Sequence, residues 1–142
     1  MTELELQAQV ADYLRLQYPH VLFHSDFGSG IKLTPGQAMR QKRLQGGRRS
    51  WPDMFIAEAM PKMGYKGIMI WYGLFLELKR PDVKIYKKNG ELVANEHIRE
   101  QAALLSELRQ RGYVAEFACG FDEAKKIIDE YLGKPDKGEV EF

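Results

Sequence analysis

The sequence predicts an α/β fold in which helices flank a mixed central β-sheet. Apolar residues recur at helical spacing before Pro19 and again across residues 96–111. The stretch from Ile68 to Lys79 is almost continuously apolar, as expected for a strand that is buried on both faces. The elements follow the order helix, strands, helix, strand, helix, which is typical of helices packed on a sheet.

Length and composition favour a single globular domain. The chain has 142 residues, of which 44% are hydrophobic and 29% are charged, and a chain of this length buries about two-thirds of its unfolded surface. We expect one domain over residues 1–133, followed by a polar tail over residues 134–142. The 21 basic and 20 acidic residues exclude a histone-like polycation, although the net charge of +1 hides local clusters.

Nothing in the sequence points to export or to a membrane. The segment from Met1 to Leu6 lacks the basic and apolar parts of a secretory signal. The apolar run at residues 68–76 is too short to cross a bilayer as a helix. The lone Cys119 excludes an intrachain disulfide and a multi-cysteine zinc site, and it suits a reducing compartment. We therefore expect a cytoplasmic protein.

The first helix is predicted from Leu6, Val10 and Leu14, which repeat at helical spacing. Thr2 is a candidate N-cap ahead of an acidic first turn, and Pro19 ends the helix. A short strand is expected at residues 21–24, which are rich in β-branched and aromatic side chains.

The segment from Gly28 to Pro52 differs sharply in composition from its surroundings, because glycines punctuate it and all of its charged side chains are basic. The basic residues are Lys32, Arg40, Lys42, Arg43, Arg48 and Arg49. Residues 35–44 are expected to form a short helix, with Pro35 in its first turn and Gly46-Gly47 after its end. Arginine side chains bind phosphates, and glycines let backbone N–H groups approach them closely. We therefore interpret the segment as nucleic-acid-binding; the alternative is a solvated loop.

Two strands are expected next, at residues 53–57 and across the apolar run. Gly73 marks either a bend in that run or a break into two short strands. Residues 87–90 form a charged turn, in which Asn89-Gly90 favours a tight hairpin.

The C-terminal part is expected to add a helix, a strand and a helix. The helix at residues 96–111 has Asn95 as its candidate cap and Gly112 as its stop. A strand follows at residues 113–118, and Asp122 is predicted to cap the last helix. The buried side of that helix is predicted to consist of Ala124, Ile127, Ile128, Tyr131 and Leu132.

The most informative constellation is Pro52-Asp53 followed by Glu77-Leu78-Lys79. Rival Asp/Glu-any-Lys triplets occur at residues 82–84 and 123–125, so the triplet alone is not specific. Position distinguishes them, because residues two apart in a strand share a face whereas on a helix they diverge. Glu77 and Lys79 therefore project together at the end of a predicted buried strand, and Asp53 opens the neighbouring strand.

Two acids and a lysine at adjoining strand ends suit metal-assisted phosphodiester hydrolysis. Carboxylate and carbonyl oxygens favour Mg²⁺ or Mn²⁺ over zinc. The metal offsets phosphate charge and lowers the pKa of a bound water, while Lys79 orients that water or stabilises developing charge. The alternative is a buried structural ion pair between Glu77 and Lys79, with Asp53 as a turn residue.

These residues resemble the signature of the PD-(D/E)XK nuclease superfamily. Flanking features resemble its VRR-NUC branch, in particular the small stand-alone type of phages and bacteria. The features are Glu3 with Gln7, the glycine-rich basic stretch before Pro52, Glu100-Gln101, Leu108 and Gly112-Tyr113. The resemblance extends from Glu3 to Leu132. Compared with compact members, this chain has a longer segment between Asp53 and Glu77, which includes residues 60–66.

The resemblance implies a restriction-endonuclease-like core with the element order αβββαβα, and it implies a role for each matching residue. Asp53, Glu77 and the Leu78 carbonyl would bind Mg²⁺ or Mn²⁺, and Lys79 would be the catalytic lysine. Gln101 would support the site from the helix behind it. For the N-terminal acid, Glu3 is preferred to Glu5 because it shares a helical face with Gln7.

The implied function is a metal-dependent DNA endonuclease that acts as a homodimer on branched or junction DNA, in a bacterium or a phage-infected cell. One alternative is a module of the same fold that binds nucleic acid without cleaving it, and another is an unrelated interaction protein. Trp51 either stacks on a base or anchors the core. The histidines fit no zinc pattern, although His97 lies four residues before Gln101 and so shares its side of the helix.

Overall fold

A mixed sheet forms the centre of the fold in the computed structural model, which describes residues 1–26 and 32–133. The first residues of the glycine-rich basic segment, 28–31, and the predicted tail at residues 134–142 lie outside these ranges. The elements are α1 (Glu3–Gln17), β1 (Phe23–Ser25), α2 (Pro35–Leu44), β2 (Met54–Ile56), β3 (Met60–Gly64), β4 (Gly67–Trp71), β5 (Leu74–Lys79), α3 (Glu96–Gln110), β6 (Val114–Cys119) and α4 (Phe121–Leu132).

The central sheet has four strands in the order β1-β2-β5-β6. β1 pairs antiparallel with β2, and β2 pairs antiparallel with β5. β5 and β6 are parallel, joined by a crossover that contains α3. The predicted mixed sheet is therefore confirmed. Without α2, β3 and β4, the remaining elements follow the expected order αβββαβα.

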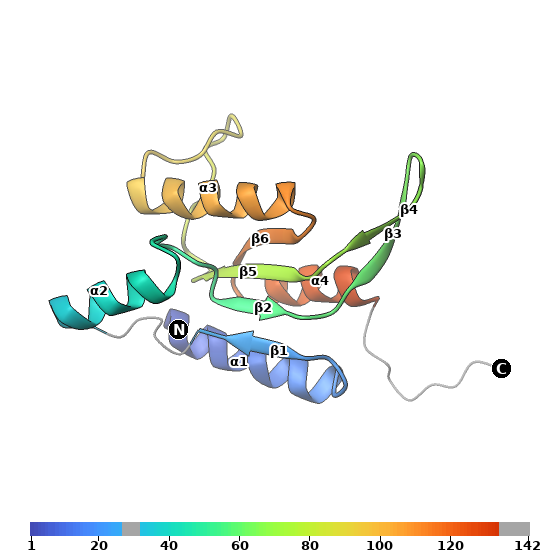
Figure 1. Ribbon diagram of the computed structural model, residues 1–142, viewed down its shortest axis with the longest axis horizontal. Coiled ribbons are helices and arrows are strands. Elements are labelled where there is room, and N and C mark those ends of the chain that lie inside the picture. Colours follow the sequence, from blue (N-terminus) through green and yellow to red (C-terminus); the bar gives the residue numbers. More distant parts are fainter. Residues whose placement is uncertain (27–31, 134–142) are drawn as a thin grey trace.

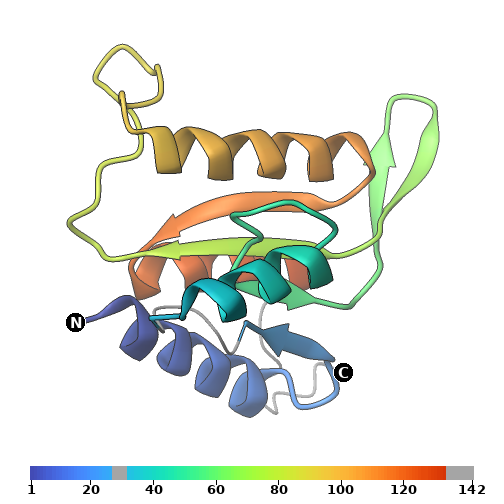
Figure 2. The ribbon, with the colours of Figure 1, turned by 60° about the vertical axis from the view of Figure 1, so that its left-hand side comes forward.

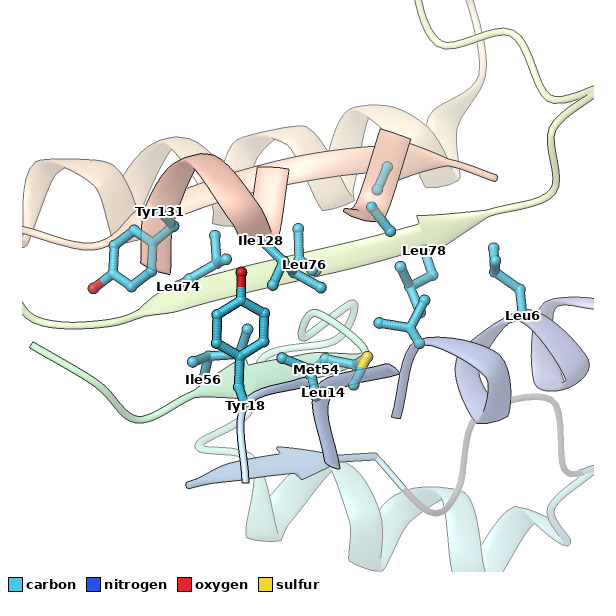
Figure 3. Packing of buried hydrophobic residues seen from close by; sticks show 13 residues of the cluster. Leu6, Leu14, Tyr18, Met54, Ile56, Leu74, Leu76, Leu78, Ile128 and Tyr131 are labelled. Atoms are coloured by element: carbon cyan, nitrogen blue, oxygen red, sulfur yellow. The ribbon is translucent and has the colours of Figure 1, made fainter. Parts of the chain in front are cut away.

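Helices cover both faces of this sheet. α1 and α4 lie on one face and α3 on the other, as Figures 1 and 2 show. Leu74, Leu76 and Leu78 of β5 point toward α1 and α4, where they pack with Leu14 and Ile128 (Figure 3). Because side chains alternate along a strand, Phe75, Glu77 and Lys79 face α3. This alternation places the charged end of β5 opposite the N-terminal half of α3.

The apolar run is not one strand buried on both faces, as its composition predicted. Its first part, β4, leaves the sheet and pairs with β3 in a separate two-stranded hairpin. Ile68 and Ile70 there are 73% and 54% exposed. The alternative of a break at Gly73 is confirmed. A Cβ atom at Gly73 would lie 2.5 Å from the Phe55 ring, so glycine lets the chain re-enter the sheet tightly against β2.

Several element ends agree with the sequence, and others differ; β2, α3 and β6 differ from their predicted ranges by one residue at one or both ends. Thr2 caps α1 in a capping box, Asn95 caps α3, and α2 spans Pro35–Leu44 as predicted. The first strand begins at Phe23 instead of residue 21. The cap of α4 is Gly120 rather than Asp122, which lies in the first helical turn, because the chain turns at Gly120 with a φ of 90°. The turn at residues 87–90 closes through the Gly90 N–H, which donates to the Lys87 carbonyl.

Among the described helices, none combines the length and apolar character that crossing a bilayer requires.

Candidate active site

The sheet brings Asp53, Glu77 and Lys79 together on the face that α3 covers. Met54 pairs with Leu76 across β2 and β5, so Asp53, one residue before β2, comes level with Glu77. The Leu78 N–H donates a hydrogen bond of 2.7 Å to Asp53 Oδ2 and fixes the two strand ends to each other. Lys79 Nζ lies 3.8 Å from Glu77 Oε1. The shared face predicted for Glu77 and Lys79 is therefore present.

All three charged groups are buried. Asp53 is 9% exposed, Glu77 4% and Lys79 6%. Burial raises the pKa of Glu77 well above its ordinary value, and repulsion from Asp53 raises it further. Lys79 opposes this rise without cancelling it. The single positive charge of Lys79 therefore does not balance the two carboxylates of Asp53 and Glu77. This imbalance distinguishes the cluster from a structural ion pair, in which the charges cancel.

Gln101 holds Glu77 from the helix behind it. Its Nε2 donates a 2.6 Å hydrogen bond to Glu77 Oε1. Two buried oxygens at this contact, Glu77 Oε2 and Gln101 Oε1, have no hydrogen-bond partner. A buried acceptor without a partner is costly, and a cation bound at Glu77 Oε2 would offset that cost.

The donor set fits a hard divalent cation. Asp53 and Glu77 offer carboxylate oxygens, which favour Mg²⁺ or Mn²⁺, and neither sulfur nor imidazole is part of the cluster. Within residues 1–26 and 32–133, no group of three or more His, Cys, Asp or Glu side chains is arranged to hold a metal ion. An ion bound by Asp53 and Glu77 would therefore complete its coordination with a backbone carbonyl and water.

The two N-terminal acids differ in their surroundings. Glu5 closes the capping box of α1, since its Oε2 accepts a 2.9 Å hydrogen bond from the Thr2 N–H. Glu3 lines the pocket above the site and is one of the charges that raise the pKa of Glu77. Between these two acids, Glu3 is thus the one near the site. Gln7, one turn further along α1, is buried and donates to the Asp26 carbonyl.

A pocket with a volume of about 840 Å³ opens above the carboxylates. Its floor includes Asp53, Glu77, Lys79 and Gln101, and its wall is formed largely by α2 and the loop that follows. Of the six predicted nucleic-acid-binding residues, Lys42, Arg43 and Arg49 line this pocket. These three cations therefore share the pocket with the acidic cluster.

Lys32, Arg40 and Arg48 are not among the residues that line the pocket. Arg48 instead forms a 2.5 Å ion pair with Glu107 of α3. The basic segment thus divides into side chains that face the site and at least one that attaches the segment to α3. Sequence alone could not separate Arg48 from Arg49, because the loop between α2 and β2 has no periodic structure.

The pocket also contains residues that the sequence did not identify as part of a site. Asp26 follows β1 and lines the pocket, and its N–H donates to the Asp53 carbonyl. Nothing in the local sequence around Asp26 indicates this position. Trp51 both lines the pocket and packs against Phe75, so its two proposed roles are compatible. His97 is exposed at the pocket wall.

Comparison with known proteins yields a match in structure. The sequence matches no family model and no curated protein significantly. A solved structure described as a VRR_NUC domain protein is similar over 100% of this chain and 98% of its own, with a TM-score of 0.59 and 21% sequence identity. The resemblance found in the sequence is thus supported by a match over the whole length. The chain has the fold of a VRR_NUC domain protein.

Proposed function

We propose that this protein is a metal-dependent nuclease that hydrolyses phosphodiester bonds in DNA. The observation that carries the proposal is the buried cluster of Asp53, Glu77 and Lys79 beneath a pocket lined by cations. The VRR_NUC-like fold supports it, because the resemblance assigns catalytic roles to these same positions. We further propose that residues 1–133 form a single nuclease domain that acts in the cytoplasm.

Each residue has a distinct task in this proposal. Asp53, Glu77 and the Leu78 carbonyl hold Mg²⁺ or Mn²⁺, which when bound supplies charge neutralisation and an activated water. Lys79 orients the attacking water and stabilises charge on the phosphate oxygens. Gln101 fixes the rotamer of Glu77, since its amide donates to one carboxylate oxygen. Glu3 adds negative charge at the edge of the site.

The pocket cations bind the substrate backbone. Lys42, Arg43 and Arg49 neutralise phosphates, which draws DNA toward a site that is otherwise acidic. Lys32 and Arg40 extend this basic character along the same segment of the chain, whereas Arg48 pairs with Glu107. Because phosphate contacts carry no sequence information, we propose recognition of DNA shape, with branched or junction DNA as the preferred substrate.

The direct test is cleavage of branched and linear DNA by the purified protein with Mg²⁺, with Mn²⁺ and with chelator. Asp53→Asn and Lys79→Ala should bind DNA and lose cleavage. The rival triplet at residues 82–84 offers matched controls, because Asp82 and Lys84 are exposed, so Asp82→Asn and Lys84→Ala should cut normally. Wild-type cleavage by both site variants would refute the assignment. Binding without cleavage under every metal condition would favour the non-cleaving module.

We also propose that the protein is a homodimer that joins through the β3–β4 hairpin. Pro61 pairs with Ile70 and Met63 with Ile68, so these four exposed residues form one uncharged face. An isolated two-stranded ribbon with such a face is marginal in water, and a second copy covers it symmetrically. The hairpin connects to the start of β5, whereas Lys79 ends that strand. Both active sites therefore stay open to DNA.

Light scattering after gel filtration tests the dimer. Ile68→Lys should yield a folded monomer, because it places a charge in the uncharged face. Leu16→Lys changes a comparably exposed leucine on α1 and should leave the mass unchanged. A monomeric wild-type protein, or a dimer unaffected by Ile68→Lys, would contradict this interface.

A further inference from the structure

The pocket above the site is covered by a helix that does not pack onto the sheet. α2 has no buried residue, and its Met39 side chain is 75% exposed. The helix nevertheless lines the same pocket as Asp53 and Glu77. Space is therefore left between α2 and the charged end of β5.

A hydrogen bond within the loop after α2 holds the end of that helix, and contacts with α3 attach the loop. The Trp51 indole N–H donates a 3.1 Å hydrogen bond to the Gln45 carbonyl, directly after the helix. Arg48 pairs with Glu107, and Ser50 Oγ contacts Glu100 Oε2 at 3.3 Å. Ser50 has a φ of 67°, and no other described residue except glycines has a positive φ. This left-handed turn sits between Arg49 and Trp51, both of which line the pocket.

The lining combines cations with flat side chains. Lys42, Arg43 and Arg49 suit a phosphate backbone, whereas Trp51 and His97 offer rings on which bases stack. Sites that bind single-stranded nucleic acid combine these two features, because a single strand exposes both its phosphates and the faces of its bases. A fully paired duplex presents only its backbone and the edges of its bases.

Size gives an independent argument. A volume of about 840 Å³ falls within the range of pockets that enclose one drug-sized ligand. The carboxylates at the floor are less than one-tenth exposed, so a phosphate must enter beneath α2 to reach them. A single strand is narrower than a duplex, so it fits a space of this size better.

We infer that the pocket takes an unpaired DNA strand of about two or three nucleotides, so that the site acts where a strand has separated from its complement. This inference rests on the proposed nuclease function and makes it more specific. Branched DNA is then a substrate where it carries a flap or where base pairs at its branch point open, and Trp51 and His97 are base-contacting residues.

The inference is tested by binding in chelator, where metal-dependent cleavage cannot occur, and again with Ca²⁺ to offset the carboxylate charge. The probes are hexathymidylate and a blunt-ended, fully paired duplex, compared by fluorescence anisotropy at one salt concentration. We expect the single strand to bind at least tenfold more tightly. Lys42→Ala and Arg43→Ala should weaken its binding, whereas Lys126→Ala, the same change on α4 at the opposite face, should not.

Fluorine NMR of protein labelled with fluorotryptophan locates the bound strand. The chain has two tryptophans. Trp71 ends β4 and does not line the pocket, and the β3–β4 hairpin extends away from α2 (Figures 1 and 2). We expect hexathymidylate to shift the Trp51 resonance and leave the Trp71 resonance in place. Equal or tighter binding of the duplex, or an unchanged Trp51 resonance at saturation, would overturn the inference. Neither result would change the outcome of the cleavage assay. If the single strand binds but is not cleaved with any metal, the proposed nuclease function is refuted instead.

Discussion

Gln101 donates its amide N–H to Glu77 Oε1 at 2.6 Å, and this contact joins the helix behind the site to the strand that carries it. It uses one carboxylate oxygen and leaves Oε2 without a partner. The amide thus selects the rotamer in which the second oxygen remains available for an ion. We interpret Gln101 as a positioning residue.

Gln101→Met removes this hydrogen bond while keeping a side chain of similar size. We expect affinity for Mn²⁺, measured by calorimetry, to fall about 10–100-fold, as is typical when a group that orients a metal ligand is lost. Gln110→Met at the exposed end of the same helix is the control and should bind Mn²⁺ normally. Unchanged affinity in Gln101→Met would show that Glu77 needs no support from α3.

Glu77→Gln should stabilise the metal-free protein at neutral pH. Burial and Asp53 raise the pKa of Glu77, so its ionised form is disfavoured in the folded protein. Ionised Glu77 therefore lowers the stability of the folded protein. This loss is absent below the pKa of about 4.3 that Glu77 has in the unfolded chain, grows as pH rises, and is complete above its pKa in the folded protein. In chelator we expect the variant to melt higher than wild type by about 2–4 °C, corresponding to about 1 kcal/mol in a domain of this size.

The melting difference between Glu77→Gln and wild type should shrink as the pH is lowered toward the unfolded pKa. Added Mn²⁺ should raise the melting temperature of the wild type only, and more at higher pH, because the ion competes with the proton for Glu77. A wild type that is more stable than the variant in chelator at neutral pH would contradict this account.

Arg48 and Arg49 are neighbours in sequence with different surroundings, and DNA binding should separate them. Arg49 lines the pocket, whereas Arg48 pairs with Glu107. Arg49→Ala should weaken binding and reduce the slope of log affinity against log salt by about 1, because one phosphate contact is lost. Arg48→Ala should leave that slope nearly unchanged. If the two variants had the same slope of log affinity against log salt, either both arginines or neither would contact phosphates, and the predicted difference between them would be wrong.

Asp129 should contribute to stability far from the site. Its Oδ1 accepts hydrogen bonds from the Tyr13 and Tyr18 hydroxyls at 2.6 and 2.8 Å, which join α4 to the N-terminal helix. Asp129→Ala leaves both hydroxyls without this acceptor and should cost about 2 kcal/mol in urea unfolding, with DNA binding intact. Glu130→Gln, at the next and exposed position, should be neutral. A neutral Asp129→Ala would show that water replaces the carboxylate at no cost.

The contribution of Asp129 also depends on pH. Burial alone would raise its pKa, but hydrogen bonds from Tyr13, Lys125 and Tyr18 outweigh burial and lower it. A lowered folded pKa means that the stabilisation is present above the unfolded pKa and disappears as pH falls through the folded pKa. The difference in unfolding free energy between wild type and Asp129→Ala should therefore decrease in acid.

The sequence predicted the parts of the fold that local physics determines. Thr2, Asn95 and the Pro35 helix follow from capping and backbone preferences, and the shared face of Glu77 and Lys79 follows from strand geometry alone. Ile68 to Ile70 were placed wrongly because an apolar composition does not show whether a segment joins the main sheet. Asp26 was missed because its approach to Asp53 depends on the pairing of β1 with β2, which has no local signature.

The β3–β4 hairpin also bears on how the carboxylate pair can be found in other sequences. β2 and β5 pair directly with each other, and the hairpin forms its own sheet outside that pairing. Lengthening or shortening the ribbon would therefore leave the Asp53–Glu77 geometry in place. A search pattern that fixes the number of residues between the two acids would overlook chains of this architecture. A pattern that allows a spacing of variable length would find them.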